Sequence, residues 1–79
     1  ADVAVVMALR EVAPAYAGTL SEATPLGIEG VGLDSIGHLE LVLGVERAAG
    51  VKLKKSDLTA EALATVGSLA AMVEKARHE

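Results

Sequence analysis

The run from residue 36 to residue 49 constrains the fold more than any other part of the sequence. Its apolar residues recur at helical spacing, Asp34 and Ser35 at its start are both candidate N-caps, and Gly50 supplies a C-terminal stop signal. On a helical wheel of about 100° per residue the apolar side chains fall on two sides. One side holds Leu41, Val42, Val45, Ala48 and Ala49, and the other holds Ile36, Leu39 and Leu43.

Two apolar faces require two partners. If the first face packs into the core, the second is either covered by the loop that precedes the helix or left exposed as a docking surface, with Glu40 and Arg47 on its flanks. The sequence leaves both alternatives open. Gly37 and Gly44 lie within this helix, where each costs about 1 kcal/mol relative to alanine. Either another segment approaches the backbone closely there, or the glycines are simply tolerated because packing stabilises the helix.

Other segments predict a helical protein. An N-terminal helix is indicated by apolar residues at helical spacing and ends or kinks near Ala13, because Pro14 follows. A short piece near residues 57–63 with Ser56 as a possible cap precedes a last helix that opens at Thr65. Tyr16 is the only aromatic residue, so the core is aliphatic, which favours helices over a sheet. We therefore predict an all-α fold, a four-helix bundle with a long first loop and a short third helix.

Residues 17–34 form the long connection, which is punctuated by two kinds of turn-forming residue, glycine and proline. Loops of this length are usually functional. Aliphatic residues are scattered through it, so we expect the loop to be pinned onto the core; they are Leu20, Leu26, Ile28, Val31 and Leu33.

Size and charge exclude several classes of function. With 79 residues the chain is one domain, residues 1–79, too small to enclose a water-free catalytic cleft, so we expect no enzyme. The net charge is −4 and residues 1–50 hold only two basic side chains, Arg10 and Arg47, which disfavours nucleic-acid binding and favours a partner with a basic patch. There is no cysteine, and two histidines alone indicate no metal site. With no membrane-length apolar run or basic signal start, we expect a soluble, cytoplasmic protein. We also expect a monomer.

Ser35 could be a helix cap, a nucleophile or an attachment point. The nucleophile hypothesis is disfavoured, because residues 33–37 read LDSIG and lack the first glycine of the G-x-S-x-G elbow. His38 lies three residues later, but we interpret it as a solvated or packed first-turn histidine and not as a base.

The pattern as a whole resembles the phosphopantetheine attachment site of acyl carrier proteins. An Asp-Ser-Ile triplet opens an acidic, apolar helix after a long loop, and the resemblance spans essentially the whole chain. The residues that carry it are Gly32, Leu33, Asp34, Ser35 and Ile36, then Glu40 and Leu41, then GVKL at 50–53 and TVGSLAAMV at 65–73.

The resemblance implies that Ser35 receives 4'-phosphopantetheine from coenzyme A through a separate phosphopantetheinyl transferase. The arm then carries an acyl group as a thioester, and the protein is a tether without catalytic residues. It further implies that Asp34 and Ile36 belong to the cofactor site and that acyl-loading and ketosynthase-type enzymes read the helix. The implied partner-binding residues are Leu39, Glu40, Leu43, Glu46 and Arg47.

The charge of this helix is more dilute than in the strongly acidic carriers of fatty-acid synthesis, so we expect recognition through apolar contacts. The LDSI motif favours a polyketide or specialised-metabolite carrier over a peptidyl carrier, in which GGHS or GGDS is common. Two alternatives remain: an aminoacyl or peptidyl carrier, and a helical interaction module in which Ser35 is an ordinary N-cap whose loss costs about 1 kcal/mol.

Overall fold

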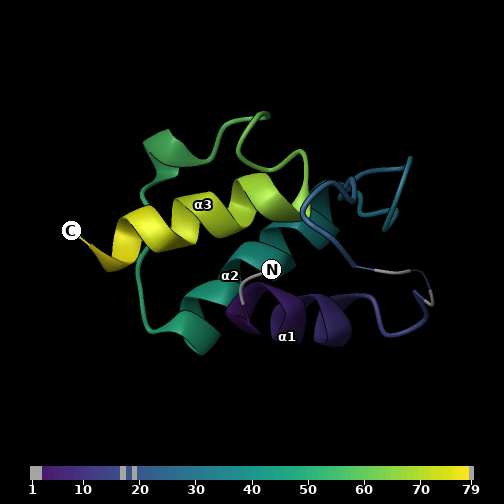
Figure 1. Ribbon diagram of the computed structural model, residues 1–79, viewed down its shortest axis with the longest axis horizontal. Coiled ribbons are helices and arrows are strands. Elements are labelled where there is room, and N and C mark those ends of the chain that lie inside the picture. Colours follow the sequence, from purple (N-terminus) through teal and green to yellow (C-terminus); the bar gives the residue numbers. More distant parts are fainter. Residues whose placement is uncertain (1–2, 17, 19, 79) are drawn as a thin grey trace.

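The computed structural model describes residues 3–16, 18 and 20–78, and three α-helices are found in these ranges. They are α1 (Val3–Val12), α2 (Ser35–Ala49) and α3 (Val66–Arg77), with a 3-10 turn, η1 (Lys55–Asp57), between α2 and α3 (Figure 1). Within the described ranges there is no β-strand, only an isolated antiparallel bridge between Pro25 and Thr65. The all-α prediction is confirmed, but the count of four helices is not.

The expected short third helix is absent. Residues 55–57 form η1, and Ser56 lies inside this turn instead of capping a helix. Hydrogen-bonded turns follow, in which the Leu63 amide donates to the Thr59 carbonyl at 3.1 Å and the Ala62 amide donates to Thr59 Oγ1 at 3.1 Å. A helix this short repays little of its nucleation cost, and the Thr59 hydroxyl offers the backbone a competing acceptor.

The helix ends lie where the local signals put them. Helix α1 ends at Val12, two residues before Pro14. Helix α2 has Asp34 as its N-cap and Gly50 as its C-cap, with Gly50 in the left-handed region at φ 68°. Helix α3 opens with a capping box, in which Thr65 accepts from the Ser68 amide and Ser68 accepts from the Thr65 amide. Capping chemistry of this kind is local, so the sequence could predict it.

The core is almost wholly aliphatic and is built from all three helices, the long loop and the segment after α2. Helices α1 and α2 approach each other closely where Gly44 meets Ala8: a Cβ added at Gly44 would lie 3.3 Å from the Ala8 Cβ. This confirms the close approach of another segment at Gly44. None of the helices in the described ranges is long and apolar enough to span a membrane. The core side chains are Val5, Ala8, Leu9, Leu26, Leu41, Val42, Val45, Leu53, Val66, Leu69, Met72 and Val73.

The long loop is tied to the start of α3 by backbone hydrogen bonds. The Leu26 amide donates to the Ala64 carbonyl at 2.9 Å, the Val66 amide to the Thr24 carbonyl at 3.0 Å and the Gly67 amide to the Glu22 carbonyl at 2.9 Å.

Most of the loop's aliphatic side chains are covered, as expected. Leu26 is fully buried, and Leu20, Val31 and Leu33 are half-buried against the core. Ile28 differs from the expectation, because it is 95% exposed at the loop tip. The loop therefore leads into the start of α2 while packed against the core.

Candidate functional site

Ser35 is the first residue of α2, and its side chain is exposed. The helix cap is its neighbour Asp34, whose Oδ1 accepts from the Gly37 amide at 2.7 Å. The Ser35 hydroxyl makes no hydrogen bond to any residue in the described part of the chain. Of the two candidate caps, Asp34 does the capping and Ser35 is left available.

The backbone around Ser35 offers unpaired donors. The Ser35 and Ile36 amides have no acceptor among residues 3–16, 18 and 20–78, whereas the Gly37 amide is taken by Asp34. Such amides at a helix N-terminus, together with the positive end of the helix dipole, favour an anionic oxygen nearby. A hydroxyl beside two free amides is a donor set that fits a phosphate ester on Ser35.

His38 lies one turn into α2 and is half-buried. Its Nδ1 is 2.8 Å from the Asp34 carbonyl oxygen, and because a carbonyl can only accept, Nδ1 is the donor. The ring is therefore hydrogen-bonded through Nδ1 to the backbone at the start of α2. No hydrogen bond joins His38 to the Ser35 hydroxyl in the described structure.

An open hollow adjoins Ser35 and His38, between the start of α2 and the turn before α3. Leu33 lies on its loop side and Leu63 on its turn side. The local sequence pattern carries no signal for this surface, because its walls come from segments far apart in the chain. Its lining consists of Gly27, Leu33, Asp34, Ser35, His38, Ala60, Leu63 and Ala64.

The second apolar face of α2 is exposed. Ile36 is 67%, Leu39 58% and Leu43 50% accessible to solvent. The alternative in which the long loop covers this face is therefore wrong: the loop packs on the start of α3 instead. Glu40 and Arg47, the predicted flanking charges, are exposed as well. We call these five residues of α2, namely Ile36, Leu39, Glu40, Leu43 and Arg47, the α2 outer face.

Glu46 is placed differently from the other predicted partner-binding residues. It is half-buried, and its Oε2 accepts from the Leu53 amide at 2.8 Å. This bond ties the segment after α2 back to the helix. The structure therefore gives Glu46 a structural contact, although it lies one turn after Leu43 on the same side of α2.

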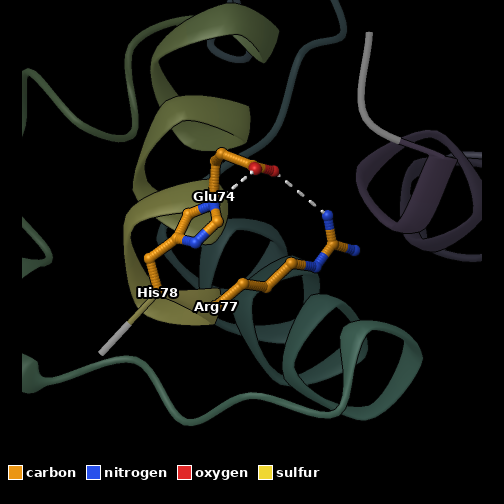
Figure 2. Close-up of polar contacts among 3 residues, drawn as sticks. All are labelled: Glu74, Arg77 and His78. Atoms are coloured by element: carbon orange, nitrogen blue, oxygen red, sulfur yellow. Dashed lines mark hydrogen bonds and ion pairs between the residues drawn. The ribbon is translucent and has the colours of Figure 1, made fainter.

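A second polar cluster lies at the other end of α3. Glu74 pairs with Arg77 at 3.4 Å and with His78 at 3.0 Å (Figure 2). All three side chains are exposed, and surface pairs of this kind contribute about 1 kcal/mol or less. The described residues hold no group of three or more potential metal-ligating His, Cys, Asp or Glu side chains.

Comparison with known proteins supplies the family. The family model described as "phosphopantetheine attachment site" matches residues 4–73. Comparison with curated proteins finds no match. The chain belongs to the family of phosphopantetheine-binding carrier proteins, whose members bear covalently attached 4'-phosphopantetheine. Carrier domains of this family are in general tethering modules that interact with phosphopantetheinyl transferases and with biosynthetic enzymes.

Proposed function

We propose that this chain is an acyl carrier protein in which Ser35 bears the 4'-phosphopantetheine arm, for biosynthesis of the polyketide or fatty-acid type. The observation that carries the assignment of Ser35 is its placement: an exposed hydroxyl, free of capping duty, beside unpaired amides at the start of α2. The family membership identifies the cofactor. The Asp-Ser-Ile triplet at residues 34–36 supports Ser35 as the residue that bears it.

The attachment reaction is a phosphoryl-type transfer carried out by a separate transferase. The Ser35 Oγ attacks the phosphorus of coenzyme A that bears the pantetheine. The new Oγ–P bond replaces the pyrophosphate P–O bond, adenosine 3',5'-bisphosphate leaves, and a base on the transferase takes the serine proton. Because the transferase activates the hydroxyl, this chain needs no base of its own, which agrees with the lack of a hydrogen-bonded base at Ser35 in the described structure.

The residues around Ser35 hold the product rather than make it. The unpaired Ser35 and Ile36 amides would be donors for the phosphodiester oxygens, and the helix dipole would favour their negative charge. Asp34 keeps the first turn of α2 in place through its bond to the Gly37 amide. When bound, the cofactor supplies a thiol that carries cargo as a thioester at the end of a flexible arm, which raises its effective concentration at each partner.

The α2 outer face is the proposed docking surface for the transferase and the biosynthetic enzymes. It begins beside Ser35 and continues along the helix, so a partner that binds the phosphopantetheine arm would also contact this face. Its centre is aliphatic, formed by Ile36, Leu39 and Leu43, and its charges are one acid and one base. Such a surface favours recognition by apolar packing, with charge setting the orientation.

An aminoacyl or peptidyl carrier of a nonribosomal pathway is the second candidate. It would share the arm and the attachment site and differ in cargo. The LDSI sequence at residues 33–36 favours the acyl carrier. The modified protein would be offered in parallel to an acyltransferase with malonyl-coenzyme A and to an adenylating enzyme with amino acids and ATP. Acyl loading detected by mass supports the acyl assignment, and aminoacyl loading alone overturns it.

The test of the attachment site is intact-protein mass spectrometry after incubation with coenzyme A, magnesium and a broad-specificity phosphopantetheinyl transferase. We expect the parent protein to gain the mass of one phosphopantetheinyl group and the Ser35→Ala variant to gain none. A known carrier in the same reaction controls for transferase activity. A mass gain in both proteins would place the arm elsewhere, and a gain in neither would contradict the proposed function.

A further inference from the structure

His38 is the titratable side chain of the hollow to which the proposed function gives no role. It follows Ser35 by three residues, and side chains at this spacing are neighbours on a helix surface, about 5–6 Å apart at Cβ. Both residues line the same hollow. The ring is also held in place, because Nδ1 donates to the Asp34 carbonyl at 2.8 Å.

The hydrogen bond at Nδ1 determines what the other ring nitrogen can do. In the neutral ring one nitrogen donates and the other accepts, so with Nδ1 as donor Nε2 can only accept. An anion beside Ser35 also offers only acceptors, and the two would repel. Protonation of the ring puts a hydrogen on Nε2 and a positive charge on the imidazole, which converts the repulsion into a charge-assisted hydrogen bond.

We infer that His38 is a positioning residue for the phosphodiester on Ser35: its protonated ring donates from Nε2 to a phosphate oxygen and holds the base of the arm against the hollow. The inference rests on the proposed attachment at Ser35. The phosphate then receives donors from two sides, the amides of Ser35 and Ile36 and the His38 ring. The restraint depends on pH, because the imidazole is the group whose charge changes between about pH 5 and 8.

Few other charges face His38. Within the hollow the only other titratable side chain is that of Asp34, and its Oδ1 is engaged with the Gly37 amide. The loop contributes Gly27 and Leu33, and the turn before α3 contributes Ala60, Leu63 and Ala64, none of which titrates. Glu61 on that turn is exposed and lies outside the lining. The phosphodiester is therefore the main new charge that His38 would meet.

The test uses ³¹P nuclear magnetic resonance of the modified protein. A phosphodiester does not titrate between about pH 5 and 8, so a ³¹P shift that moves with pH in this window reports a neighbouring group that does. We expect one such step in the parent protein, with the same midpoint as the ring signals of His38. The modified His38→Gln variant keeps an amide donor but cannot become charged, and we expect its ³¹P shift to stay flat. His78→Gln is the matched control and keeps the step.

The ring signals provide a second readout that needs no variant. The midpoint of the His38 titration should lie at higher pH in the modified protein than in the unmodified one, because the added anion favours the charged ring. The midpoint of His78, at the other end of α3, should not change. A flat ³¹P profile in the parent, or a step that persists in His38→Gln, overturns the inference and leaves the proposed function intact. Failure of the parent to gain the arm would instead overturn both.

Discussion

Two adjacent residues at the start of α2 have different roles: one caps the helix and the other exposes its side chain. Asp34 has extended backbone dihedrals and caps the helix through its carboxylate, while Ser35 is helical and exposes its hydroxyl. If the serine were the cap, its hydroxyl would be bonded to the backbone and turned away from an incoming transferase. The order Asp-Ser therefore frees the hydroxyl while the helix start stays fixed.

This division predicts unequal costs of substitution at the residue scale. Asp34→Ala removes the cap and should lower the free energy of unfolding by about 1 kcal/mol. Ser35→Ala should change it by less than about 0.5 kcal/mol, since the hydroxyl has no partner in the described structure. Urea denaturation of the two unmodified variants measures both. An equal loss in Ser35→Ala would mean that its hydroxyl does cap the helix.

At the scale of elements, backbone hydrogen bonds hold the long loop and the start of α3 together. The bridge between Pro25 and Thr65 and the neighbouring backbone bonds join the loop to the first turn of α3. Gly67 is required at this contact, because a Cβ there would lie 2.7 Å from the Glu22 carbonyl oxygen. The loop in turn leads directly into Asp34, so the position of the proposed attachment site depends on how the loop is held.

Gly67→Ala tests this contact. Alanine improves helix propensity by about 1 kcal/mol, but the clash with backbone atoms costs about 1–3 kcal/mol, so we expect a net loss of stability. Gly27→Ala is the matched control, because a Cβ there meets nothing within 4 Å. Thermal unfolding followed by circular dichroism compares the two. A Gly67→Ala variant more stable than the parent would show that the loop moves away at no cost.

At the scale of the whole molecule, one side of α2 packs into the core and the opposite side is exposed to solvent. Leu41 and Val45 are fully buried, whereas Leu39 is 58% and Leu43 50% exposed. A small domain gains stability by burying apolar side chains, so leaving these in solvent is unexpected unless a partner covers them. The exposed side chains share their helix with Ser35, so the α2 outer face lies beside the proposed attachment site.

Surface truncations should separate docking from stability. Leu39→Ala and Leu43→Ala should each lower kcat/KM for phosphopantetheinyl transfer by up to about tenfold, the loss expected for a central interface residue. Val3→Ala and Met7→Ala remove side chains of similar exposure, 70% and 55%, from α1 and should change it less than about twofold. Steady-state kinetics with one transferase measures all four. Equal losses on α1 and α2 would contradict the proposed docking face.

Local chemistry made much of this protein predictable from its sequence. The caps at Thr65 and Gly50 and the stop before Pro14 depend on neighbouring residues only, and the structure confirms them. The second apolar face of α2 follows from helical periodicity, and the Asp-Ser-Ile triplet brought out the family resemblance that the family model confirms. All of these are interactions over one to four residues, for which spacing in the chain is spacing in space.

Only the tertiary structure decided what each surface meets. Periodicity could not tell whether the loop covers Leu39 and Leu43, because that depends on the backbone bonds that fix the loop to α3. It could not foresee the Glu46 bond to Leu53, nor that residues 57–63 form turns in place of a helix. The hollow beside Ser35 and His38 is likewise made by segments distant in the chain. Sequence spacing determines contacts along a helix, whereas contacts between segments are determined by packing of the whole chain.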